Sequence, residues 1–142
     1  ETAGLKYSDK FGDTTLGEAL LVPTRIYVKT MLSLMDEVEV KGMCHITGGG
    51  LYENVPRMLS EDTKAKINLK DFEIPEIFKL IEEKGNIERE EMYNTFNMGI
   101  GFVFAVDEKD SEKVKAFFEN KDEELIELGT VEKGHREVCL EY

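Results

Sequence analysis

Hydrophobic residues recur along this chain with two different spacings, which together predict alternating helices and strands. A spacing near 3.6 residues places apolar side chains on one helical face, whereas strict alternation places them on one face of a strand. We predict helices over residues 23–36, 74–85, 88–93 and 111–118. We predict strands over residues 38–46, 63–69, 98–106, 125–131 and 137–142. Because helices and strands alternate, the expected class is α+β, with helices packed on a mixed sheet.

Three local features refine this prediction. The first predicted helix carries one apolar stripe opposite charged and polar residues, and Pro23 suits its first turn. That stripe comprises Ile26, Tyr27, Thr30, Met31, Leu34 and Met35. Residues 1–22 show no sustained period, so we expect an irregular lead-in with at most one short element. The last two predicted strands flank Gly134 and can pair as a hairpin.

The composition indicates one packed domain over residues 1–142, of which 41% are hydrophobic. No run of about 18 apolar residues occurs, which excludes a membrane-spanning helix and leads us to expect a soluble protein. The chain carries 30 acidic and 18 basic side chains, a net charge of −12. This charge repels phosphate backbones and argues against nucleic-acid binding, so any anion must be bound by local groups.

The cysteines and the first residues indicate a cellular setting. Cys44 and Cys139 are too few for a disulfide framework and favour a reducing, cytoplasmic environment, although the two could form one pair. The chain begins at Glu1 without a basic and apolar leader, so we expect no secretory signal. The absence of an initial methionine suggests a piece of something longer.

A glycine triplet follows the first predicted strand in the segment HITGGGLYENVPR, residues 45–57. If a helix begins near Gly50, then Thr47 and the glycines form a strand-to-helix turn whose backbone N–H groups converge on one spot. Such a turn can bind an anion. The alternative is a turn whose glycines only supply positive φ angles. The segment matches neither a Walker A loop nor GxGxxG, so it indicates no named nucleotide-binding fold.

Asn54 and Arg57 lie three residues apart and would share a helical face near this turn. Asn54 could donate a hydrogen bond to phosphate, and Arg57 could add a bidentate, charge-assisted contact. A solvated surface arginine is the alternative. Pro56 would kink a helix that begins at Gly50, whereas with Asn54 as the cap it would lie in the first turn.

His45 ends the first predicted strand, directly before the glycine turn. Histidine exchanges protons near neutral pH, so this residue is our candidate for the catalytic group. A histidine that only satisfies its own hydrogen bonds is the alternative. A zinc site that combines both cysteines with both histidines fails on geometry, because strand neighbours point to opposite faces and residues four apart on a strand are about 13 Å apart. We therefore predict no metal site.

The segment TFNMGIGFVFAV, residues 95–106, predicts a strand with one face stripped of bulky side chains. Gly99 and Gly101 would lie on that face, where a ligand or another backbone can approach closely. Close packing of a helix needs the same feature and is the alternative. Asn97 stands where the strand begins and could orient a substrate amide or stabilise its own turn.

Taken together, three motifs of this chain resemble one family. HITGGGLYENVPR, with PTRIYVK before it and EMYNTFNMGIGF after it, resembles the C-terminal half of the phosphoribosylformylglycinamidine cyclo-ligases, or aminoimidazole ribonucleotide synthetases. The resemblance extends from about Leu16 to the end and keeps the order and spacing of the motifs. KGNIEREEMYNTFN is typical of this family rather than of its relatives, such as selenophosphate synthetase. The resemblance implies a ferredoxin-like mixed sheet.

The resemblance also implies an activity in purine biosynthesis. Complete members use ATP and magnesium to activate the formyl oxygen of formylglycinamidine ribonucleotide, after which an amidine nitrogen closes the imidazole ring. Most ATP and magnesium ligands, and the main contact of a homodimer, lie in an N-terminal ATP-binding domain that this sequence does not include. By this resemblance the isolated chain is inactive, and its partners are that domain and the substrate.

The resemblance assigns roles to the residues singled out above. Gly48, Gly49 and Gly50 would supply backbone donors to a phosphate, with Asn54 and Arg57 in support. His45 would move a proton or stabilise charge, and Asn97 would position the substrate. Which phosphate is held, that of the ribose or one from ATP, stays open. A sibling ATP-dependent enzyme and a stand-alone ligand-binding module without chemistry are the alternatives.

Overall fold

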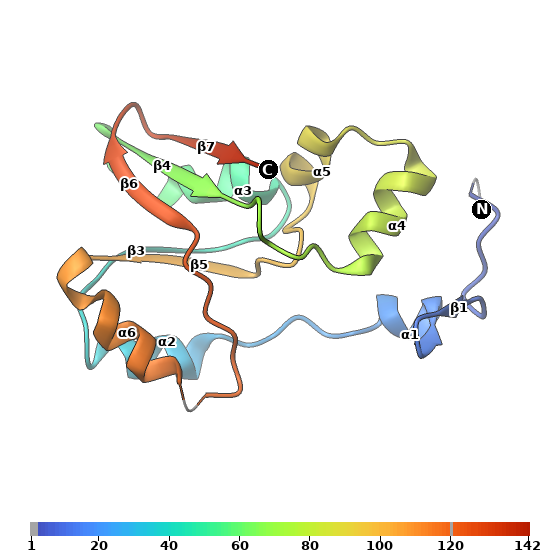
Figure 1. Ribbon diagram of the computed structural model, residues 1–142, viewed down its shortest axis with the longest axis horizontal. Coiled ribbons are helices and arrows are strands. Elements are labelled where there is room, and N and C mark those ends of the chain that lie inside the picture. Colours follow the sequence, from blue (N-terminus) through green and yellow to red (C-terminus); the bar gives the residue numbers. More distant parts are fainter. Residues whose placement is uncertain (1–2, 120) are drawn as a thin grey trace.

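The computed structural model describes residues 3–119 and 121–142 and confirms the α+β class (Figure 1). In this part of the chain the strands are β1 (Lys10–Phe11), β2 (Thr14–Thr15), β3 (Val40–His45), β4 (Thr63–Asn68), β5 (Phe102–Val106), β6 (Gly129–Lys133) and β7 (Glu137–Glu141). The α-helices are α1 (Leu16–Leu20), α2 (Val28–Met35), α3 (Gly50–Asn54), α4 (Glu76–Gly85), α5 (Arg89–Thr95) and α6 (Ser111–Phe118). Two 3-10 helices, η1 (Val55–Met58) and η2 (Glu108–Asp110), precede β4 and α6.

The strands are divided between separate sheets. β3 and β5 form an antiparallel pair, and β1 and β2 form a second, very short one. The third sheet is mixed as predicted, because its central strand β4 is antiparallel to β6 and parallel to β7. The 3-10 helix η1 contacts β3, β4 and β7, and therefore lies between the two larger sheets.

The last two strands do not pair as the predicted hairpin, because β4 lies between them. Their three-residue connection crosses the beginning of β4, where the N–H of Gly134 donates to the carbonyl of Asp62 and the N–H of Arg136 donates to that of Thr63, at 2.9 and 2.6 Å. Two strand spacings are about 10 Å, which three residues can span. Insertion of β4 gives both of its edges a partner and buries Ile67.

Two groups of buried side chains stabilise the fold. The larger lies among β4, α3 and α5, and its fully buried members include Leu51 and Tyr93. The smaller includes Leu34 of α2 and Val114 of α6, packed against side chains of the β3–β5 pair. Figure 1 shows α2 and α6 on the same side of this pair. Full burial of such a side chain is worth about 1.5–3 kcal/mol.

The first predicted helix is shorter than its pattern suggests. α2 begins at Val28, and Pro23 lies in the irregular segment before it. Met31 and Leu34 are buried as predicted, whereas Ile26 is exposed. Periodicity alone does not form a helix, because helical stability in proteins comes mostly from packing of the apolar face. In the structure residues 21–26 are exposed, and Tyr27 is the first residue of this segment to pack against the core.

The lead-in carries more structure than expected. Residues 6–20, here called the N-terminal lobe, contain β1, β2 and α1, and Figure 1 shows them apart from the rest of the molecule. α1 begins with a capping box, in which the N–H of Glu18 donates to the Thr15 hydroxyl and the N–H of Thr15 donates to the Glu18 carboxylate. None of the helices in the described ranges has the length and apolar character needed to cross a bilayer.

Candidate functional site

The ends of β3 and β5 bring several predicted site residues together. His45, the last residue of β3, lies opposite Phe102, the first residue of β5. The N–H of Ile46 donates to the carbonyl of Gly101 at 2.9 Å, so the pairing continues one step beyond both strands. The glycine turn leaves the sheet directly after Ile46. The segments 45–50 and 97–102 therefore meet at one end of the β3–β5 pair.

The glycine triplet forms the predicted strand-to-helix turn. The N–H of Gly50 donates to the carbonyl of Thr47 at 3.0 Å, and α3 begins at Gly50. Gly49 and Gly50 have φ angles of 93° and 54°, a region that favours glycine. The N–H groups of Gly48 and Gly49 have no hydrogen-bond partner within the described ranges. The turn thus combines both predicted features, positive φ angles and free backbone donors.

The Asn54 side chain holds this turn rather than facing a ligand. It is 2% exposed, and its Nδ2 donates to the carbonyls of Gly50, Gly48 and Thr47 at 2.8, 3.2 and 3.4 Å. Its Oδ1 accepts a hydrogen bond from Nη1 of Arg57 at 3.3 Å. The expectation that Asn54 donates to a phosphate conflicts with this geometry, because its donors are already engaged by the turn.

Arg57 lies at the surface beside the turn. Its side chain is 65% exposed, and Nη2 lies 3.5 Å from Oε2 of Glu53. The Glu53 side chain also lies against Gly49. A carboxylate therefore sits next to the free donors and offsets the charge of Arg57. Pro56 lies in the first turn of η1, which follows α3 at Asn54, so the proline starts a new helical segment instead of kinking α3.

His45 is exposed and sits in an aromatic cluster. Its ring centroid lies 5.8 Å from that of Tyr27, edge to face, and 6.3 Å from that of Phe102, stacked. Its neighbour Cys44 is partly buried, and burial raises the pKa of the Cys44 thiol to about 11 despite the opposing effect of Arg57. Within the described ranges, no three His, Cys, Asp or Glu side chains are placed to hold a metal ion.

The segment before β5 is a turn rather than a strand, which corrects one prediction. Met98 and Gly99 have φ angles of 52° and 101°, and β5 begins only at Phe102. Gly99 and Gly101 therefore do not share a strand face. The Oδ1 of Asn97 accepts a hydrogen bond from the N–H of Gly99 at 3.0 Å, so Asn97 stabilises its own turn. Its predicted role toward a substrate is untested by this geometry.

The two glycines of this turn have different packing reasons. A Cβ on Gly99 would lie 2.7 Å from Cδ of Pro75, and a Cβ on Gly101 would meet the Tyr27 hydroxyl. Gly99 therefore admits the chain that leads into α4, and Gly101 admits an aromatic side chain. Close approach was the predicted purpose of both glycines, and in the structure the approaching group is protein.

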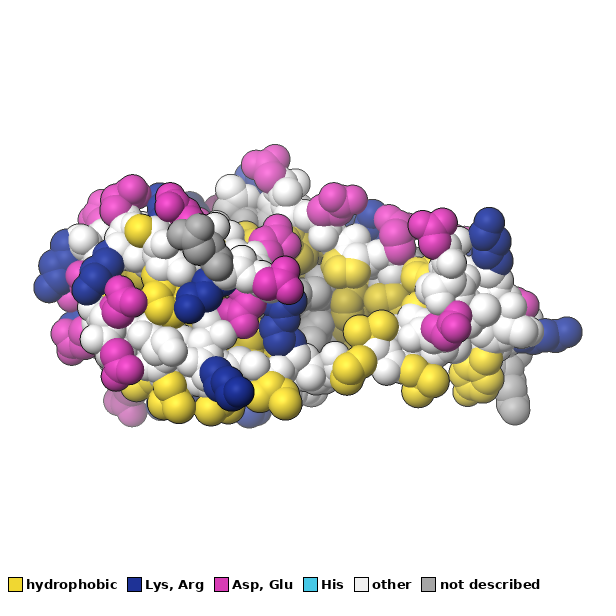
Figure 2. Space-filling model, turned by 90° about the horizontal axis from the view of Figure 1, so that it is seen from below, with side chains coloured by type: hydrophobic (Ala, Val, Ile, Leu, Met, Phe, Trp, Pro, Cys, Tyr) yellow, Lys and Arg dark blue, Asp and Glu magenta, His cyan; other side chains and the backbone are white. Residues whose placement is uncertain are grey.

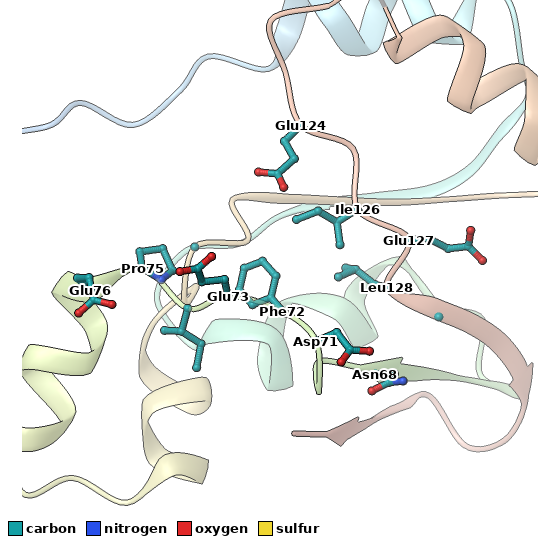
Figure 3. Close-up of a pocket in the computed structure, with 13 residues that line it drawn as sticks. Asn68, Asp71, Phe72, Glu73, Pro75, Glu76, Glu124, Ile126, Glu127 and Leu128 are labelled. Carbon is teal, nitrogen blue, oxygen red and sulfur yellow. The ribbon is translucent and has the colours of Figure 1, made fainter.

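Sequence reasoning missed a groove of about 870 Å³ that Gly99 lines. Figure 3 shows Phe72, Ile126 and Leu128 pointing into it, with Glu73 and Glu124 among the acidic groups around it. The runs DFEIPE, residues 71–76, and EELIELG, residues 123–129, supply most of its lining. Their shared mixture of acidic and apolar residues is the signal that could have indicated it. The carboxylates disfavour a phosphate here.

Comparison with known proteins identifies the family. The model of the AIR synthase related protein C-terminal domain matches residues 1–140. This chain belongs to that family. A phosphoribosylformylglycinamidine cyclo-ligase of Finegoldia magna is 51% identical over 140 residues, which are 99% of this chain and 41% of the relative. Enzymes of the same name from Lachnospira eligens and Carboxydothermus hydrogenoformans are 53% and 49% identical, over 94% of this chain and 39% and 38% of their own lengths.

This AIR synthase-related domain thus spans about 40% of the length of the curated relatives it matches. Both comparisons agree with the resemblance carried by the three motifs. The matched region covers almost the whole chain, so it includes the segments that meet at the end of the β3–β5 pair.

Proposed function

We propose that this chain is the C-terminal domain of an ATP-dependent cyclo-ligase that converts formylglycinamidine ribonucleotide to aminoimidazole ribonucleotide. The supporting observation is the 51% identity to an enzyme of that name over 99% of the chain. In the proposed reaction, the formyl oxygen takes a phosphoryl group from ATP, and ADP leaves. An amidine nitrogen then bonds to the formyl carbon, the C–O bond breaks, phosphate leaves, and the nitrogen loses a proton.

The residues at the end of the β3–β5 pair suit parts of this chemistry. The N–H groups of Gly48 and Gly49 would bind a phosphate oxygen, since they are the free donors of the turn. His45 is exposed directly beside this turn and would accept the proton from the amidine nitrogen. Arg57 would add positive charge from the surface. Asn54 contributes by holding the turn, and Asn97 by holding the neighbouring one.

ATP and magnesium would be held mainly outside this chain. Phosphoryl transfer needs metal ions that neutralise charge on the transferred group, and oxygen ligands that hold them. The described residues provide no cluster of carboxylates suited to a metal ion. We propose that the magnesium ligands lie mainly in the N-terminal ATP-binding domain. We propose a cytoplasmic enzyme that forms a homodimer when complete.

An exposed apolar surface supports docking of that N-terminal domain. It extends from the N-terminal lobe along the following segment to the outer side of α2. Its residues are Leu20, Leu21, Val22, Ile26, Val28, Leu32 and Met35, all exposed. Figure 2 shows several groups of hydrophobic side chains along the lower margin of this view, with polar side chains and backbone between them. Surfaces of this kind mark interaction sites. The relatives carry more than half of their length outside the matched region, which provides the partner.

A chimeric enzyme tests the proposed function. The matched region of the Finegoldia magna cyclo-ligase is replaced by this chain, and ring closure is measured at saturating ATP and magnesium. We expect the chimera to cyclise formylglycinamidine ribonucleotide, and the chain alone to show no magnesium-dependent ATP hydrolysis. A His45→Asn chimera is the matched control and should lose about 10²–10⁴-fold in rate. A folded, dimeric chimera without cyclisation would contradict the proposal and favour a sibling enzyme or a binding module.

A further inference from the structure

The rings of three residues from distant parts of the chain, Tyr27, His45 and Phe102, lie in contact with one another. Tyr27 precedes α2, His45 ends β3 and Phe102 begins β5. The ring centroids of Tyr27 and Phe102 lie 5.2 Å apart, and each ring also contacts the imidazole of His45. Tyr27 and Phe102 are partly buried against the core beneath α2, whereas His45 is exposed. A fixed pair of rings thus supports an accessible imidazole.

Gly101 makes this arrangement possible. The Tyr27 hydroxyl occupies the space in which a side chain at residue 101 would begin. Gly101 has no positive φ angle, so the backbone itself would accept alanine. Glycine is therefore needed here for the approach of Tyr27, and any larger residue would displace that ring.

The His45 ring has two aromatic contacts in the described structure. Among the side-chain hydrogen bonds of the described residues, none involves this imidazole. A histidine at the exposed end of a strand would ordinarily sample several rotamers. Edge-to-face and stacked contacts favour particular ring geometries and contribute about 0.5–1.5 kcal/mol per pair. The two neighbouring rings therefore limit its rotation.

We infer that Tyr27 is a positioning residue, which holds the imidazole of His45 in one orientation at the glycine turn. The inference rests on the proposed function for its catalytic meaning, because only there does the orientation of His45 matter to a reaction. Its structural content stands by itself. Proton transfer depends on the placement of the acceptor, and a displacement of about 1 Å can cost a hundredfold in rate.

Nuclear magnetic resonance of the imidazole signals tests the placement without any activity. The chain has 2 histidines, so His135, which lies outside the cluster, serves as an internal control. In the wild-type chain we expect nuclear Overhauser contacts between the rings of Tyr27 and His45, and ring-current shifts on His45 alone. Absence of these contacts in the folded wild-type chain would overturn the inference, whatever the variants do.

Two different changes should release the ring. Tyr27→Leu removes the aromatic contact, and Gly101→Ala displaces Tyr27 without removing any ring. Both should move the His45 signals toward those of a free imidazole and leave the His135 signals in place. Tyr27→Phe keeps the ring and should restore the wild-type His45 signals, while Tyr7→Leu, in the N-terminal lobe, is the matched control. Unchanged His45 signals in folded Tyr27→Leu would contradict the inference.

Kinetics of the chimeric enzyme separate this inference from the proposed function. Tyr27→Leu should lower kcat by up to about a hundredfold while KM stays within about twofold, because orientation and not binding is lost. A rise in KM with unchanged kcat would overturn the positioning role. If His45→Asn leaves the rate unchanged while the imidazole signals behave as expected, the catalytic role of His45 fails and the placement by Tyr27 stands.

Discussion

The backbone carbonyl of Tyr93 lies where a side chain on Gly50 would begin. This close approach joins the start of α3 to the end of α5, and the carbonyl of Phe96 lies 2.8 Å from the same point. Gly49 has a positive φ angle, and the atoms nearest to an added Cβ belong to the Glu53 side chain, whereas Gly48 faces open space. The three glycines therefore serve three purposes, which substitution can separate.

Alanine substitutions at Gly50 and Gly48 should differ in their effect on the stability of the protein. Gly50→Ala adds a methyl group against two carbonyls at a φ angle of 54°, and should destabilise the protein by at least about 2 kcal/mol. For Gly48→Ala, the matched control, the free energy of unfolding should stay within about 0.5 kcal/mol of the wild-type value. Urea unfolding followed by circular dichroism measures both. Equal losses at the two positions would contradict the packing account.

Phosphate binding at the turn should be weak and governed by two neighbouring charges. Arg57→Ala should weaken binding of inorganic phosphate by up to about fivefold, since an exposed charge contributes only about 0.2–1 kcal/mol. Glu53→Gln should strengthen binding, because it removes the carboxylate beside the free donors. Titration of the Gly48 and Gly49 amide signals measures both effects. Amides that do not shift in the chain or in the chimera would return the turn to a purely structural role.

Much of the fold and the site's location can be predicted from the sequence. Periodicity indicates β3, β4 and α6, because their apolar residues face a core. It misplaces the start of α2 and the partner of β6, since both depend on contacts between residues far apart in the chain. The pattern of glycines indicates close approach at Gly101 but cannot indicate that Tyr27 approaches it. Asn54 shows the same limit, because a buried amide and a ligand-binding amide look alike in sequence.

The two cysteines should differ strongly in reactivity. Burial raises the pKa of the Cys44 thiol to about 11, whereas Cys139 is exposed. The thiolate is the nucleophile, so iodoacetamide near pH 7 should modify Cys139 first, and the Cys44 rate should rise about tenfold per pH unit. Peptide mass spectrometry after timed labelling gives both rates. Equal labelling of the two cysteines at pH 7 in the folded chain would contradict the burial of Cys44.

Glu18 should contribute to the stability of the N-terminal lobe over a defined pH range. Hydrogen bonds from Thr14 and Thr15 lower the pKa of its carboxyl from 4.5 to about 2. Because the folded pKa lies below the unfolded one, the stabilisation is complete above about pH 4.5 and is lost as the pH falls towards 2. A carbon-13 titration of the Glu18 carboxyl measures this. Thr15→Val should raise the pKa, and a wild-type midpoint near 4.5 would exclude the capping box.

Asn54 offers the sharpest test of how the glycine turn is held, because its amide donates to three carbonyls of the turn. Asn54→Ala leaves those acceptors without their partner and should lower the free energy of unfolding by about 1–3 kcal/mol. Asn54→Asp has nearly the same shape but places a carboxylate against carbonyl oxygens, so it should be the less stable variant at neutral pH.

The pH dependence of that second variant separates lost donors from lost shape. Carbonyl oxygens raise the folded pKa of the new carboxyl above its unfolded value near 3.9, so its destabilisation should grow as the pH rises and shrink below about pH 4. Asn54→Ala should show no such dependence relative to wild type. Urea unfolding at pH 4 and pH 7 compares them. If the free energy of unfolding of Asn54→Asp equalled that of wild type at pH 7, the buried amide would not be the group that holds the turn. Its donors would then again be available to a phosphate.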